Sequence, residues 1–181
     1  GFAKCKFKGR NLLFLLYVAT MSIPWQVYML PQYSLMNTFG LVDTHLGYIL
    51  MQSFNAFGVF LMRQAFISIP DELLEAARID GLSEYGIYAK IMLPLSKASI
   101  TTLVIFTFVT IWNDYMGPMI YFNTETNKTI QLGIRMFIGQ YSTEYGLVMA
   151  VSVLALLPVL IIFLIGQKQF VQGVASSGIK G

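Results

Sequence analysis

The side chains in this 181-residue sequence that could do chemistry occur in two patterns. One is a charged stretch, residues 75–94 (EAARIDGLSEYGIYAKIMLP), whose acids and bases stand close together around a glycine. The other is a set of polar residues at helical spacing inside apolar sequence: Gln52, Asn55, Thr107, Thr110, Asn113 and Asp114. Both patterns suit hydrogen bonding and charge recognition rather than the making and breaking of covalent bonds.

Signatures of catalysis and metal binding are missing from the sequence. It has no G-x-x-x-x-G-K-[ST] phosphate loop, no H-E-x-x-H and no G-x-S-x-G. The lone His45 lacks a nearby cluster of Cys, Asp or Glu and suits an interfacial residue better than a ligand. The lone Cys5 excludes an intrachain disulfide. We therefore expect no catalytic residue, no metal and no cofactor in this chain.

Composition indicates the elements that must position these residues. The chain is 56% hydrophobic and 12% charged, whereas a soluble domain is about one quarter charged. A helix needs about 20 residues to cross a bilayer. Four apolar segments are that long, and they are too long for barrel strands: about 11–30, 46–67, 98–122 and 145–166. The sequence thus predicts an all-α fold, a single polytopic transmembrane helical bundle over residues 1–181.

The lysines and arginines predict the orientation of this bundle. Ten of the twelve precede the first span, lie in or beside the 68–97 connection, or follow the last span. The 31–45 connection has none, and the 123–144 connection has only Lys128 and Arg135. By the positive-inside rule, both termini and residues 68–97 are cytoplasmic. The net charge of +3 does not indicate nucleic-acid binding, because the charges cluster at membrane boundaries.

The charged connection predicts two short helices that meet at an elbow. A proline followed by two acids suits the start of the first helix, and Gly81 suits its left-handed end. Ser83 can cap a second helix through Ile91, and Pro94 opposes its simple continuation. The elbow either lies on lipid headgroups or fits a socket on a cytoplasmic partner. Three acids among the four ionisable residues of 71–78 argue against an anionic membrane surface.

The polar residues inside the spans also leave two interpretations open. They either line a wet cavity or form interhelical hydrogen bonds, which contribute about 0.6 kcal/mol each on average. For Gln52 and Asn55 the second interpretation is at least as good. Asp114 lies about 24 Å along a helix from Ala98, near the outer boundary. It is hydrated there, or it braces the turn at Gly117 and Pro118.

Residues 75–94 resemble the signature loop of the permease subunits of ABC importers. The pattern is E-A-A, three residues, G, nine residues, I-x-L-P, and every position of it matches here: Glu75, Ala76, Ala77, Gly81, Ile91, Leu93 and Pro94. The stretches GFAKCKFKGRNLLFLL, IWNDYMGPMIY and QKQFVQGVASSGIKG are similar to the carbohydrate-uptake, maltose-type branch. Such permeases usually have six spans, so we expect two spans that precede Gly1 to be absent from this sequence.

The resemblance implies a mechanism and a set of partners. It implies a second permease subunit that completes the pore, two ATP-binding subunits, an external solute-binding protein and a sugar substrate in a bacterial or archaeal cytoplasmic membrane. ATP and magnesium would bind the ATPase partner. The loop would seat in a groove of that ATPase through Glu75, Ala76, Ala77, Asp80, Gly81, Ile91, Leu93 and Pro94.

Two functions from different classes remain open on the sequence. The first is a permease for a sugar, polyol or sugar-phosphate, with the 123–144 connection either docking the binding protein or serving only as a connector. The second is a membrane assembly or regulatory subunit that recruits a cytoplasmic protein without moving solute. An intramembrane enzyme lacks its catalytic residues. The sequence does not specify which sugar is moved.

Overall fold

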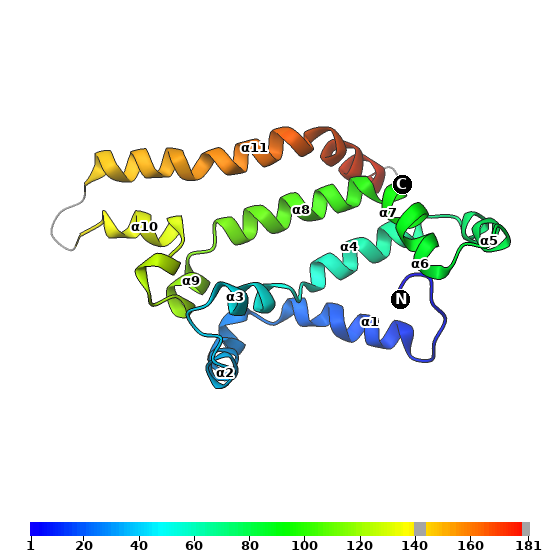
Figure 1. The fold of residues 1–181 in the computed structure, drawn as a ribbon, viewed down its shortest axis with the longest axis horizontal. Helices are drawn as coiled ribbons and strands as arrows, with labels where there is room; N and C mark the ends of the chain where they lie inside the picture. Colours follow the sequence, from blue (N-terminus) through cyan, green and yellow to red (C-terminus); the bar gives the residue numbers. More distant parts are fainter. Residues whose placement is uncertain (140–143, 179–181) are drawn as a thin grey trace. The chain divides into compact units, whose positions relative to one another are not determined.

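The computed structural model describes residues 1–139 and 144–178, with side chains as far as residue 168. These residues form helices joined by turns and contain no strand, which confirms the predicted all-α fold (Figure 1). The chain divides into two compact units. Unit 1 comprises Gly1–Ile23, Asn55–Val104 and Gly166–Gly181, and unit 2 comprises Pro24–Phe54 and Ile105–Ile165.

Unit 1 contains the two arms of the predicted elbow. Its helices are α1 (Arg10–Ala19), η1 (Thr20–Ser22), α4 (Ala56–Ile67), α5 (Asp71–Ile79), α6 (Glu84–Ile87), a π-helical turn (Tyr88–Met92), α7 (Leu93–Leu95) and the first half of α8 (Lys97–Trp112). A hydrophobic core joins the end of α4 to both arms and consists of Ile69, Leu74, Ala77, Ile87 and Met92. Helix α1 contacts α4 in the same unit.

Unit 2 is built around aromatic side chains. Its helices are α2 (Trp25–Thr38), α3 (His45–Gln52), the second half of α8, α9 (Met116–Tyr121), η3 (Glu125–Asn127), α10 (Ile130–Met136) and most of α11 (Tyr145–Gly178). The buried residues of its core are Met36, Tyr48, Tyr121 and Phe122. Trp112 of α8 donates a hydrogen bond from Nε1 to the carbonyl of Ala155 in α11, at 2.9 Å.

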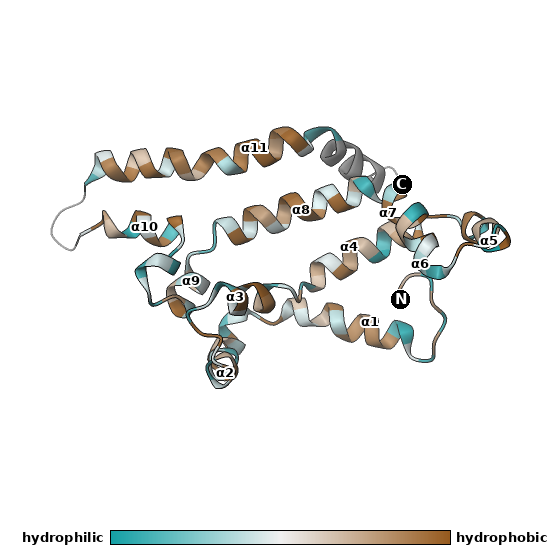
Figure 2. Cartoon of the chain, viewed as in Figure 1, coloured by the Kyte–Doolittle hydropathy of each residue, from teal (hydrophilic) through white to brown (hydrophobic). Residues whose placement is uncertain are grey.

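Helix α11 is the clearest membrane span among the described residues. The part from Tyr145 to Lys168 is 24 residues long and apolar, as its colouring in Figure 2 shows. At 1.5 Å per residue it is about 36 Å long, enough for a hydrocarbon core of about 30 Å. The number of spans rises to three if each of two bent helix pairs crosses as one broken span: Arg10–Ser22 with Trp25–Thr38, and Glu84–Leu95 with Lys97–Trp112.

Three of the four predicted spans are therefore not single helices, and a proline or a polar side chain accounts for each break. The first is interrupted at Ile23, which is extended because Pro24 follows it. The span over 46–67 is interrupted where the side chain of Asn55 caps α4. The span over 98–122 is interrupted where α8 ends at Trp112 and Asp114 accepts a hydrogen bond from the first turn of α9. At the second and third breaks, a local side-chain hydrogen bond competes with continuation of the helix.

Candidate functional site

The elbow of unit 1 ends its first arm in a left-handed glycine. Gly81 has φ +81°, the conformation predicted for it. Its N–H donates to the carbonyl of Arg78 at 3.0 Å, and the N–H of Leu82 donates to the carbonyl of Ala77 at 3.0 Å. These two bonds form a Schellman motif, which satisfies carbonyl groups that the end of α5 would otherwise leave unpaired. The backbone itself therefore fixes the angle between the arms.

The second arm starts at a side-chain cap and continues further than predicted. Ser83 accepts a hydrogen bond from the N–H of Gly86 at 3.2 Å, as expected of a cap. The helix does not stop at Ile91: it widens into the π-helical turn and continues through Pro94 to Leu95. A wider turn before a proline accommodates its ring and its missing N–H. The break comes at Ser96, where the chain bends by 75°.

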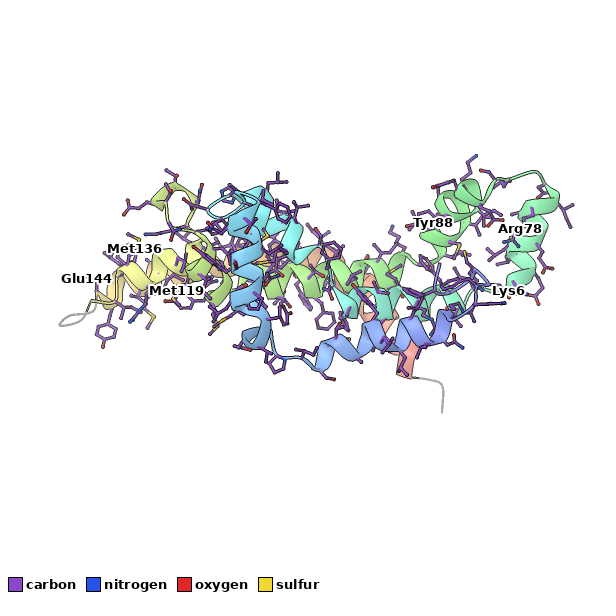
Figure 3. The ribbon with its side chains drawn as sticks, turned by 90° about the horizontal axis from the view of Figure 1, so that it is seen from below. Lys6, Arg78, Tyr88, Met119, Met136 and Glu144 are labelled. Atoms are coloured by element: carbon purple, nitrogen blue, oxygen red, sulfur yellow. The ribbon has the colours of Figure 1, made fainter. Side chains whose placement is uncertain are left out.

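Burial divides the elbow into an inner and an outer side. Leu74, Ala77 and Ile87 are 3%, 5% and 1% exposed and hold the arms together. Ile79 and Tyr85, by contrast, are 87% and 88% exposed. These two large apolar side chains therefore stand out from a charged segment. In Figure 3, the labels Arg78 and Tyr88 mark the first and the second arm of the elbow.

An ion pair connects the two arms across the glycine. Arg78 Nε donates to Glu84 Oε1 at 2.7 Å, and a second nitrogen of the guanidinium donates to Oε2 at 3.3 Å. The hydrogen bond from Arg78 lowers the pKa of Glu84, and the same bond raises the pKa of Arg78. Because both side chains are largely exposed, water screens this pair, and the elbow angle depends chiefly on the backbone bonds.

Unit 2 gathers several of the polar residues into a hydrogen-bonded cluster. Tyr48 donates a hydrogen bond to Asp114 Oδ2 and accepts one from Gln52 at 3.1 Å. The other carboxylate oxygen of Asp114 accepts from the N–H of Gly117 at 3.1 Å. A methyl group on Gly117 would lie 2.6 Å from both Asp114 Oδ2 and the Tyr48 hydroxyl oxygen, so only glycine fits.

A second carboxylate in unit 2, that of Asp43, holds the loop after α9. Asp43 has φ +60°, unusual for a residue with a side chain. Its carboxylate accepts from the N–H groups of Asn123 and Thr124, from the Thr124 hydroxyl and from the Asn127 amide. The Thr124 hydroxyl is the largest of the influences that lower the pKa of Asp43 to about 2. The group is thus a fixed anion at ordinary pH.

Comparison with known protein families shows which family this chain belongs to. The family described as "Binding-protein-dependent transport system inner membrane component" matches residues 2–176. This chain belongs to that family. The match confirms the resemblance to ABC importer permeases, and with it a membrane-embedded transport component rather than an enzyme.

Its relatives include permeases for several solutes. The chain is 36% identical over 181 residues to the arabinooligosaccharides transport system permease protein AraQ of Bacillus subtilis, covering 100% of this chain and 64% of that protein. It is 36% identical over 177 residues to the lactose transport system permease protein LacG of Rhizobium radiobacter, covering 98% and 65%. It is 36% identical over 174 residues to the sn-glycerol-3-phosphate transport system permease protein UgpE of Shigella flexneri, covering 95% and 62%.

A solved structure has a similar fold. The chain matches a bacterial ABC transporter involved in the import of the acidic polysaccharide alginate, with a TM-score of 0.80 and 26% identity over 93% of this chain and 65% of that one. This chain therefore spans 62–65% of the length of these four proteins.

The family's loop residues occupy different environments in the elbow. Ala77 is buried and Ile91 and Leu93 are half-buried, so these positions support the elbow. The remaining loop residues expected to contact the ATPase are exposed: Glu75, Ala76, Asp80, Gly81 and Pro94. Their role in coupling remains a prediction.

The six candidate pore-lining residues do not form two continuous stripes. Gln52 ends α3 while Asn55 caps α4 by accepting from the N–H of Gly58 at 3.1 Å, so the expected spacing on one helix is interrupted. Asn113 donates to the carbonyl of Val109 at 2.8 Å. Gln52, Asn55 and Asn113 thus bond within or next to their own helices, whereas Asp114 accepts from Tyr48 of α3 and braces the turn at Gly117, and a role of these four residues in lining the pore stays a prediction. Thr107 is half-buried and Thr110 is exposed on α8, and both remain candidates for the pore.

Some interactions could have been suspected from sequence and others could not. Opposite charges six residues apart across a predicted elbow were a usable signal for the Arg78–Glu84 pair. Nothing local linked Tyr48 to Asp114 or Asp43 to Thr124, because these partners are 66 and 81 residues apart.

Proposed function

We propose that this chain is the permease subunit of an ATP-driven importer and forms half of the pore for a sugar or a related solute. The relatives are permeases for arabinooligosaccharides, lactose and sn-glycerol-3-phosphate, which share hydroxyl-rich carbon skeletons. A second permease subunit supplies the other half of the pore, and an external binding protein delivers the solute. ATP and magnesium bind two separate ATPase subunits on the cytoplasmic side, which is the side predicted for both termini of this chain.

The observation that carries this proposal is the outer side of the elbow. A rigid pair of arms presents Ile79 and Tyr85, almost fully exposed, beside the acids of α5. Such a surface in water is costly because apolar area is left unburied, at about 25 cal/mol per Å². Burial in a groove of the ATPase removes that cost, and the backbone-fixed angle lets the elbow transmit closure of the ATPase to the helices on either side.

A pair of matched substitutions tests the proposal in the full-length subunit assembled with its partners. Tyr85→Lys places a charge on the outer side of the elbow, and it is expected to reduce copurification of the ATPase by about tenfold, which corresponds to a loss of about 1.4 kcal/mol of binding free energy. Tyr145→Lys changes the same residue type, 73% exposed, at the start of α11 on the predicted outer side. It is expected to leave copurification unchanged. Equal effects of the two substitutions would contradict docking through the elbow.

Solute uptake separates this proposal from the assembly or regulatory subunit. Proteoliposomes with the complete complex should accumulate a radiolabelled arabinooligosaccharide, lactose or glycerol phosphate only when ATP and the binding protein are present. Recruitment of the ATPase without uptake of any of these or related solutes would favour the alternative.

The outer connection is proposed to help dock the binding protein. Its described part, 123–139, includes α10 with Leu132 buried, and Asp43 holds its start, so it is a formed surface. Residues 140–143 of the predicted 123–144 connection lie outside the described residues. Charge reversal at Glu125 and Lys128 should weaken binding of the external protein, and unchanged affinity would leave the connection as a mere connector.

A further inference from the structure

The segment before α1 reaches the corner at which the elbow leaves α4. Lys4 Nζ lies 2.6 Å from the carbonyl oxygen of Ile69 and 2.6 Å from Asp71 Oδ1. Between these two acceptors stands Pro70, whose φ of −58° and ψ of 138° turn the chain from α4 into α5. One ammonium group thus bonds to the chain on both sides of the corner.

This contact lies at the first turn of α5, which has no capping hydrogen bond of its own. Pro70, which precedes this turn, has no N–H to donate. The side chain of Lys4 is only 16% exposed, although that of Asp71 is 74% exposed. Lys4 also lowers the pKa of Asp71, first through the hydrogen bond and then through its charge, so the carboxylate stays ionised.

The same segment is anchored to α1 and α4. Arg63 of α4 donates from Nε to the carbonyl of Phe2 at 3.1 Å, and its guanidinium carbon lies 4.0 Å from the centre of the Phe14 ring in α1. The Phe2 ring is 5.8 Å from that of Phe14. A chain of contacts therefore leads from α5 through Lys4 and the segment to α1 and α4 together.

We propose that Lys4 is a positioning residue for coupling: it ties the first arm of the elbow to α1 as well as to α4. This inference rests on the proposed function of the elbow. Without the tether, α5 is joined to α4 through the corner at Pro70 and the apolar core but has no link to α1, and part of a push on the elbow is absorbed by rotation at the corner. With it, movement of α5 displaces both helices as one body.

The test uses the full-length subunit assembled with cysteine-free partner subunits. Cys5, exposed and adjacent to Lys4, takes a spin label whose mobility reports the state of the segment. Lys4→Met keeps an unbranched apolar stem and removes the charge and the hydrogen-bond donors, whereas Lys4→Arg keeps the charge and the donors. Lys8→Met makes the same chemical change at an exposed lysine of the same segment.

Lys4→Met is expected to increase the mobility of the spin label on Cys5. It is also expected to raise the amount of ATP hydrolysed per solute transported by roughly threefold to tenfold, which is the effect expected from the loss of one partly shielded ion pair and a second hydrogen bond. Assembly with the ATPase should be unchanged. Asp71→Asn, which leaves the bond to Ile69, should raise the ratio less. Lys4→Arg and Lys8→Met should match the unsubstituted subunit in both measurements.

Two results would overturn the inference. Label mobility in Lys4→Met equal to that in Lys8→Met means that no tether exists, and a freed label with an unchanged ATP-to-solute ratio means that the tether does not position the elbow. Failure of the proposed function itself has a different signature. In that case Tyr85→Lys leaves assembly with the ATPase intact, while the spin label on Cys5 still reports whether Lys4 holds the segment.

Discussion

Replacement of Gly81 by valine tests whether backbone conformation sets the elbow. A steric clash does not contribute at this position, because a Cβ atom there would meet nothing within 4 Å. Any penalty therefore comes from the φ of +81° and not from a clash. Holding a β-branched residue in this region costs about 1–3 kcal/mol. If α5 re-aims to escape that cost, the bonds from Gly81 to Arg78 and from Leu82 to Ala77 are lost.

Gly81→Asn is the matched control, since asparagine also carries a Cβ but tolerates the left-handed conformation. A penalty of about 2 kcal/mol corresponds to a roughly thirtyfold shift between correctly and incorrectly angled arms. In reconstituted proteoliposomes, Gly81→Val should hydrolyse ATP without proportional solute uptake, and Gly81→Asn should stay close to the unsubstituted protein. If the two variants take up solute equally, at a high or a low rate, the left-handed φ of Gly81 is not what sets the elbow.

Three other predictions concern packing and charge. Gly117→Ala, which drives a methyl group into the polar cluster of unit 2, should destabilise the detergent-solubilised protein by about 1–3 kcal/mol in thermal unfolding, whereas Gly133→Ala, with open space around it, should not. Ala77→Leu overpacks the core of the elbow and should cost about 1–3 kcal/mol, but Ala76→Leu on the exposed neighbour should cost almost nothing. Because the pKa of Asp43 is lowered to about 2, its carboxylate should hold the loop after α9 fully above about pH 4 and lose this hold as the pH falls toward 2. The ratio of the hydrogen-exchange rate of that loop to the rate in Asp43→Asn should therefore rise toward one over this range, and a ratio that does not change with pH would contradict the prediction.

The elbow was predictable because its signals are local. A glycine that ends one helix and a serine that starts the next lie two residues apart, and both adopt the predicted conformations. The extension of the second arm through Pro94 was not predictable in the same way. It depends on a π-helical turn, which inserts an extra residue per turn and has no distinctive sequence pattern.

The membrane helices were predicted less well because hydropathy does not register caps. Asn55 and Asp114 look like polar residues on the face of a continuous helix, yet each accepts from an N–H three residues ahead, in the first turn of the helix that follows. A hydropathy value averaged over a window of mostly apolar residues stays high across both positions and so shows no break. Pairings such as that of Tyr48 with Asp114 are further out of reach, because they depend on the fold that brings distant segments together.

The two-sided construction of the elbow also has a consequence for engineering. Its shape depends on Ala77, on the conformation of Gly81 and on main-chain hydrogen bonds, whereas its outward chemistry depends on side chains such as Ile79 and Tyr85. The residues that set the shape of the elbow are thus different from those that would recognise its partner. A permease of this kind could be retargeted to the ATPase of another importer by exchanging a few surface side chains, with its mechanical linkage left as it is.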